Sequence, residues 1–153
     1  GIGKVDAEGE LVVVMGQQTR NVSPEDALNH VFGYTCGNDV SARVWQQGDL
    51  QWWRAKSGDT FSPIGPYIVT NLEPGSLHLI VTINNQTVQQ SGANLMIHSV
   101  PSIISFASRA MTLEPGDLIY TGTPGQTGEL HPGDQVVVSI NQIGSLVNPV
   151  IGK

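Results

Sequence analysis

Three acidic residues, Glu8, Glu10 and Asp39, stand out for the chemistry that they could do together. Glu8 and Glu10 lie two positions apart where the apolar segment ELVVVM (10–15) begins, so in a strand both side chains point to one face. Carboxylates that share a site repel one another unless a cation neutralises them, and oxygen ligands alone favour Mg²⁺, Mn²⁺ or Ca²⁺ over zinc or copper. The pattern indicates a divalent-metal site, with a solvated strand end as the open alternative.

The stretch GYTCGNDVSAR (33–43) surrounds Asp39 and contains a second charged side chain. Its glycines and its Asn-Asp pair also fit a tight turn between a helix and a strand. Arg43 could hold a carboxylate with two hydrogen bonds and orient a metal ligand, and a structural salt bridge is an equal alternative. We expect Cys36 to be buried and inert, as most free cysteines are. Of the histidines, only His98, ahead of a predicted helix, is hard to dismiss.

Length and charge restrict the class of protein. At 153 residues the chain is expected to be a single domain, 1–153. A net charge of −6 and only seven Lys and Arg argue against nucleic acid as a partner. No apolar run reaches the roughly 18 residues that a membrane-spanning helix needs, so a membrane partner is not expected either. The lone cysteine fits a reducing compartment, and we expect a cytoplasmic protein.

The elements that would position these residues form a strand-rich α+β fold with two helices packed on the sheet. A Ser-Pro-Glu-Asp start predicts a first helix from Ser23 to about Phe32, and Ser99 with Pro101 predicts a second. The apolar face of the second helix is expected to pack on the sheet. That face comprises Ile103, Ile104, Ala107, Ala110 and Met111. Segment 45–57 is expected to be a loop or lid, with Gly48-Asp49 as its turn. Strands are predicted at 10–15, 67–70, 77–83 (the first arm of a hairpin ending near Gln90), 118–120, 135–140 and 144–147.

Eight segments in order carry a resemblance over nearly the whole chain. Together they resemble the C-terminal catalytic domain of the fumarylacetoacetate hydrolase family. The segments are EGELVVVMG (8–16), SPEDAL (23–28), GYT (33–35), NDVSAR (38–43), KSGDTF (56–61), PIGP (63–66), MTLEPGD (111–117) and TGTP (121–124). The resemblance implies a mixed β-roll and a Mg²⁺ or Mn²⁺ enzyme that hydrolyses, decarboxylates or isomerises 2-oxo and 1,3-dicarbonyl acids. It also implies a homodimer.

The resemblance assigns roles to residues by position. It makes Glu8, Glu10 and Asp39 the ligands of Mg²⁺, with Mn²⁺ or Ca²⁺ able to substitute. Lys56 matches the family lysine that faces the bound oxo-acid. Two further residues match side chains of the substrate pocket, namely Thr123, which would bond the substrate carboxylate, and Gln46, which would lie along the pocket.

The same comparison leaves the reaction open. Family hydrolases take a water-activating His–Glu pair from a segment ahead of the metal motif, and here only seven residues precede Glu8, so a missing N-terminal segment is expected. Hydrolysis of a C–C bond in an acylpyruvate-like acid is the first expectation. Segments 60–66 and 144–148 look more like the branch that isomerises or decarboxylates 2-hydroxyhepta-2,4-diene-1,7-dioate. A metal-binding but catalytically silent domain and a plain interaction module are the alternatives from other classes.

Overall fold

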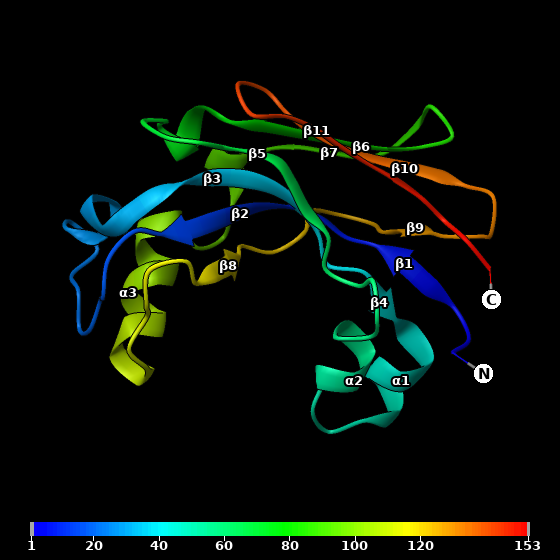
Figure 1. The fold of residues 1–153 in the computed structure, drawn as a ribbon, viewed down its shortest axis with the longest axis horizontal. Coiled ribbons are helices and arrows are strands. Elements are labelled where there is room, and N and C mark those ends of the chain that lie inside the picture. Colours follow the sequence, from blue (N-terminus) through cyan, green and yellow to red (C-terminus); the bar gives the residue numbers. More distant parts are fainter. Residues whose placement is uncertain (1, 153) are drawn as a thin grey trace.

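The computed structural model describes residues 2–152, and two four-stranded sheets make up most of it (Figure 1). One sheet has the order β11-β10-β6-β7 and the other the order β5-β3-β2-β8, while a small third sheet has the order β4-β1-β9. The strands are β1 Val5–Ala7, β2 Gly9–Met15, β3 Val31–Asn38, β4 Ser41–Ala42, β5 Ile64–Val69, β6 His78–Ile83, β7 Gln86–Gly92, β8 Leu118–Tyr120, β9 Gly128–Glu129, β10 Gln135–Ile140 and β11 Gly144–Pro149. The strand-rich α+β prediction is confirmed.

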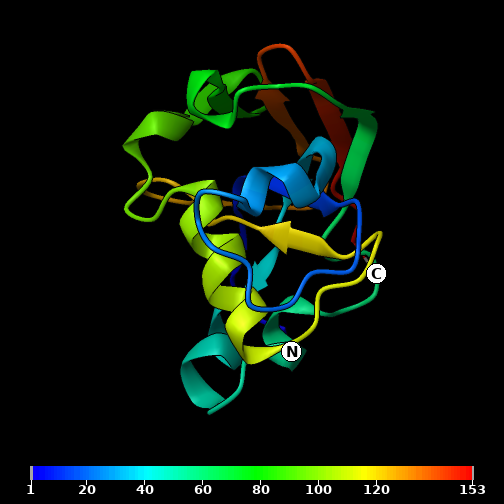
Figure 2. The same cartoon turned by 90° about the vertical axis from the view of Figure 1, so that its left-hand side faces the viewer.

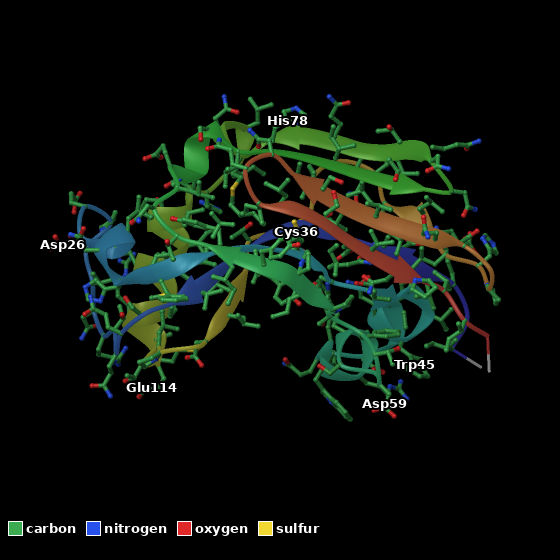
Figure 3. All side chains as sticks on the ribbon, turned by 45° about the horizontal axis from the view of Figure 1, so that its top comes forward. Asp26, Cys36, Trp45, Asp59, His78 and Glu114 are labelled. Carbon is green, nitrogen blue, oxygen red and sulfur yellow. The ribbon has the colours of Figure 1, made fainter. Side chains whose placement is uncertain are left out.

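The main core lies between the two four-stranded sheets. It contains Leu11 and Val13 of β2, Val81 of β6 and Val138 of β10, and all four side chains are buried. Cys36 is also buried there, as expected, and Figure 3 labels it near the middle of the molecule. Burial of this apolar surface is the main force that holds the sheets face to face.

Strand β2 is central because it pairs on both sides, with β3 and with β8. Its side chains alternate, so Leu11 and Val13 enter the core while Glu10 and Val12 face the other side of the sheet. The register places Glu10 opposite Gly37 and Gly9 opposite Asn38. Glu10 thus lies near the start of a strand that is fully buried, and Glu8 lies directly ahead of it, which fixes the backbone of both residues.

The predicted first helix is wrong over most of its length. Only the 3₁₀ turn η1, Ala27–His30, forms, and Asp26 ahead of it makes no side-chain cap. Phe32, the expected helix end, belongs to β3, which begins at Val31. Pairing of this β-branched and aromatic segment with β2 and β5 satisfies its backbone, so tertiary contacts outweigh the local helix signal.

The second predicted helix is confirmed as α3, Val100–Ala110, and Ser99 accepts a hydrogen bond from the Ser102 amide. Its predicted apolar face is only partly right. Ile104 is buried, but Ala110 is exposed and Met111 lies outside the helix with 58% of its surface exposed. Instead α3 buries two serines, which bond segment 20–22 and the helix backbone. Figure 2 shows α3 beside β8.

The predicted loop 45–57 is wrong as well, because it contains two short helices, α1 Arg43–Gly48 and α2 Trp53–Lys56. They project from the sheets as a small lobe that carries Trp45 (Figures 1 and 3). Arg54 joins the two helices, since its guanidinium bonds Asp49 at 2.6 and 2.9 Å and lies 5.0 Å from the centre of the Trp45 ring. Gly48 of the predicted turn is the last residue of α1, and Asp49 begins the link 49–52 between the two helices.

Candidate metal centre

The backbone brings the two halves of the acidic motif together through Asn38. Glu8 lies between β1 and β2, and its amide donates to Asn38 Oδ1 at 2.9 Å. The amide of Asp39, just after β3, donates to the Glu8 carbonyl at 2.8 Å. Asn38 is 1% exposed, so this clamp is shielded from water. Because β3 ends at Asn38, the next residue, Asp39, lies beside the two glutamates.

The structure brings Glu8, Glu10 and Asp39 into one cluster, as predicted. One oxygen from each carboxylate lies within 4.8 Å of the others. Glu8 is 7% and Glu10 is 3% exposed, whereas Asp39 is half-buried. These are not the solvated side chains of a strand end, which was the alternative interpretation. Three oxygen donors that converge from two segments fit a hard divalent cation.

Charge within the cluster is incompletely balanced without a cation. Burial raises the pKa of Glu10 to about 7, against the hydrogen bond from the Gly122 amide, and Asp39 and Glu8 raise it further. With this pKa the Glu10 carboxyl group is only partly ionised near neutral pH. A divalent cation would favour the ionised carboxylate, so the donor set and the electrostatics both fit a metal such as Mg²⁺ or Mn²⁺.

Lys56 contacts two of the three carboxylates. Its ammonium lies 2.8 Å from Glu8 Oε2 and bonds Asp39 Oδ2 at short range. Burial acts to lower the pKa of Lys56, but the hydrogen bonds to Asp39 and Glu8 outweigh it, so the pKa is raised. Lys56 comes from the end of α2, so the lobe delivers a fixed positive charge to the cluster. A cation bound by these oxygens would compete with the ammonium for them.

Arg43 lies behind the cluster and joins several segments. Its guanidinium contacts Glu8 Oε1 at 2.6 Å and Asp6 Oδ2 at 2.8 Å. It also donates to Gln46 Oε1 at 2.7 Å and to Thr127 Oγ1 at 3.1 Å. The salt bridge, one of the two alternatives that the sequence left open, is therefore present. Arg43 holds Glu8 Oε1 through a charge-assisted bond, and its role in orienting a metal ligand stays a prediction.

Asp6 is the partner that holds Arg43, and sequence reasoning missed it. It is 2% exposed, and Thr127 Oγ1 also donates to its Oδ2 at 2.7 Å. Burial acts to raise the pKa of Asp6, but the hydrogen bonds of Arg43 and Thr127 outweigh it and lower the pKa. The signal was present in the alternation of Asp6, Glu8 and Glu10, since period two places all three on one side of an extended chain.

The two predicted substrate contacts have different positions. Gln46 is held by Arg43, close to Glu8 but with its oxygen already in use. Thr123 lies on the loop that also donates the Gly122 amide to Glu10 Oε2 at 2.7 Å. Its hydroxyl donates to the Gly9 carbonyl at 2.9 Å. Thr123 is thus bonded to Gly9, the residue between the two glutamates. That Thr123 binds the substrate carboxylate stays a prediction.

A cavity of about 500 Å³ borders the Thr123 loop. Its wall includes Leu11, Leu79 and Ile103, together with loop residues 121–125 and the exposed His98. None of the three carboxylates lines it. Leu11 faces the core while Glu10 faces the opposite side of β2, and the Thr123 loop borders both the cavity and the carboxylate cluster.

The fold and the site define a class: a strand-rich domain with a largely buried cluster of three carboxylates that could hold a hard cation, flanked by a lysine. The model of the fumarylacetoacetate (FAA) hydrolase C-terminal domain matches residues 1–151. The chain belongs to this family, as its motifs predicted.

Similar proteins include isomerases of known structure. The 5-carboxymethyl-2-hydroxymuconate delta-isomerase of Mycobacterium smegmatis is 45% identical with a TM-score of 0.96, over 98% of this chain and 61% of that one. The 2-hydroxyhepta-2,4-diene-1,7-dioate isomerase of Mycobacterium marinum is 48% identical with a TM-score of 0.95, over 97% of this chain and 60% of that one. The predicted resemblance to this branch is confirmed.

Curated relatives are longer than this chain. Protein Rv2993c of Mycobacterium tuberculosis is 47% identical over 152 residues, and the match covers 97% of this chain but 57% of that protein. Oxaloacetate tautomerase YisK of Bacillus subtilis is 41% identical over 157 residues, which is 96% of this chain and 52% of that protein. Within residues 2–152, no helix is long and apolar enough to span a membrane. The cytoplasmic location stays a prediction.

Proposed function

We propose that this chain is the metal-binding catalytic part of an enzyme that moves a proton on a small 2-oxo acid, as in keto–enol tautomerisation or double-bond isomerisation. The observation that carries the proposal is the cluster of three carboxylate oxygens within 4.8 Å, with the Lys56 ammonium bonded to two of them. The names of two isomerases and a tautomerase among the similar proteins support this class of reaction.

Mg²⁺ or Mn²⁺ is the proposed cofactor, with Glu8, Glu10 and Asp39 as its protein ligands. Bound there, the ion would polarise the carbonyl of the oxo-acid and stabilise the enolate oxygen. Lys56 supplies a second positive charge beside that oxygen. Arg43 and Asp6 keep Glu8 in place, because a carboxylate held by a buried ion pair cannot rotate away when the substrate binds or leaves.

Hydrolysis of a C–C bond is the second candidate. The fumarylacetoacetate hydrolase of Exiguobacterium antarcticum supports it, with 42% identity and a TM-score of 0.95 over 98% of this chain and 57% of that one. The two reactions share an enolate, so the same carboxylates and Lys56 serve both. They differ in whether water attacks the neighbouring carbonyl carbon, a step that needs a general base.

The test is to assay the purified chain with Mg²⁺ against oxaloacetate for tautomerisation and against acetylpyruvate for cleavage. We expect tautomerisation that Asp39→Asn abolishes and that Asp59→Asn, in an exposed loop, leaves unchanged. Cleavage of acetylpyruvate would favour the hydrolase. Metal binding without either reaction would identify a silent domain, and no metal binding by calorimetry would refute the proposal.

We also propose that the chain forms a homodimer. Several large apolar side chains are exposed, among them Ile97 at 95% and Phe106 at 73% of their surface. Surface of this kind is typical of an interface between protein chains. Light scattering after size exclusion should give twice the mass of 16.3 kDa, and a monomer at micromolar concentration would contradict the proposal.

A further inference from the structure

A buried glutamine joins the metal-bearing strand to the Thr123 loop. Gln89 lies on β7, an edge strand, directly opposite Val81 of β6. Paired residues of neighbouring strands point to the same face, and Val81 is fully buried in the core. Gln89 is 4% exposed, so a polar side chain has been placed among apolar ones. Such a position is costly unless the amide is fully hydrogen-bonded.

The amide of Gln89 makes three hydrogen bonds, and all go to the two segments that build the site. Its Oε1 accepts from the Gly9 amide at 3.1 Å. Its Nε2 donates to Thr123 Oγ1 at 2.8 Å and to the Pro124 carbonyl at 2.7 Å. Gly9 lies between Glu8 and Glu10, so one side chain spans from the metal ligands to the loop.

These partners also determine which way the amide points. The Gly9 amide can only donate and the Pro124 carbonyl can only accept, so oxygen and nitrogen of Gln89 cannot be exchanged. It follows that Thr123 Oγ1 accepts a hydrogen bond from Gln89. Because the same hydroxyl gives its proton to the Gly9 carbonyl at 2.9 Å, it has one lone pair left and no free proton.

We infer that Gln89 is a positioning residue for substrate binding: it holds Thr123 Oγ1 at a fixed place, so that the hydroxyl proton has only two acceptors, the Gly9 carbonyl and the carboxylate of a bound 2-oxo acid. The inference rests on the proposed function. A carboxylate needs a donor, so binding requires the hydroxyl to turn from Gly9 while Gln89 keeps its oxygen in place. Without Gln89, Thr123 Oγ1 would lose this donor and the loop would lose its bond at Pro124, while its bonds to Glu10 and Gly9 would remain.

The first test uses the metal-free chain and needs no activity. Gln89→Met keeps the length and packing of the side chain but removes all three hydrogen bonds. We expect the Gly9 amide to exchange its hydrogen at least about tenfold faster. Gln90→Met on the same strand, where the side chain is exposed, is the matched control and should not change it. Equal exchange in both variants would overturn the inference.

The second test measures binding of oxalate, a planar dicarboxylate, to the Mn²⁺-loaded chain by calorimetry. We expect Gln89→Met to weaken oxalate binding about tenfold while the Mn²⁺ affinity changes little. In the Thr123→Val background the same substitution should have little further effect, since the two residues act through one hydroxyl. Additive losses would mean that Gln89 only stabilises the fold, which would overturn the inference.

A third variant keeps the inference testable if Gln89→Met does not fold. Gln89→Glu can still accept from the Gly9 amide but cannot donate to Thr123 or Pro124. It should retain slow exchange at Gly9 and lose oxalate affinity, and unchanged affinity would count against the inference. If the unchanged chain fails to bind Mn²⁺, the proposed function fails, whereas the exchange experiment still decides whether Gln89 positions the loop.

Discussion

Glu10 allows a quantitative prediction about the metal-free protein. It is 3% exposed, and its pKa is raised to about 7 from an ordinary value of 4.5. The folded chain therefore binds this proton more tightly than the unfolded chain does. Between these two pH values stability must fall as pH rises, because ionisation is easier in the unfolded state. The contribution is fully present below about pH 4.5 and lost above about pH 7.

The size of the effect follows from the shift. A difference of about 2.5 pKa units corresponds to about 3 kcal/mol at 1.36 kcal/mol per unit. This is a large share of the stability of an ordinary domain. Glu10→Gln should remove most of this dependence, because the amide carries no charge at any pH. The metal-free variant should thus be about 3 kcal/mol more stable than the unchanged chain at pH 8 and similar to it at pH 4.

The assay is urea unfolding in EDTA at a series of pH values. Glu114→Gln, an exposed glutamate, serves as the matched control and should follow the unchanged chain. Excess Mn²⁺ should restore stability at pH 8 in the unchanged chain but much less in Glu10→Gln, since the ion binds the ionised carboxylate. Parallel pH profiles for Glu10→Gln and the unchanged chain would refute the electrostatic reasoning.

Three further substitutions test neighbouring parts of the site. Lys56→Met should lower turnover at least about 100-fold, because a positive charge beside the enolate is lost. Mn²⁺ should bind as tightly or more tightly, because the ammonium competes for the same oxygens, and weaker binding by calorimetry would contradict this. Asp6→Asn should reduce metal affinity about tenfold, since Arg43 loses its buried counter-charge, and unchanged affinity would argue against an orienting role. Gly37→Ala should cost about 1–3 kcal/mol in thermal unfolding, because a Cβ there would overlap Val12 Cγ2 and lie 2.7 Å from the Tyr120 ring. A loss under 0.5 kcal/mol would show that both side chains can move aside at little cost.

Local sequence patterns predicted an element correctly where tertiary packing favours the same secondary structure. Strand β2 follows from an apolar β-branched run, and α3 follows from the Ser99 cap and the proline in its first turn. The first predicted helix had equally good local signals, but its last two residues, Val31 and Phe32, belong to β3, which pairs with β2 and β5. A short helix cannot compete with two rows of sheet hydrogen bonds, and only three-dimensional pairing reveals them.

The acidic cluster and its preference for a hard cation were predictable from the sequence alone, since oxygen donors at period-two spacing beside a buried strand are a local pattern. The contacts of Lys56 with carboxylates 48 and 17 residues away, and of Gln89 with Gly9 across 80 residues, become visible only in the folded chain. Both contacts depend on sheet register and on how two sheets stack. A hydrogen bond between distant segments forms only once packing has brought its donor and acceptor atoms to about 3 Å from each other. No local sequence pattern specifies that approach.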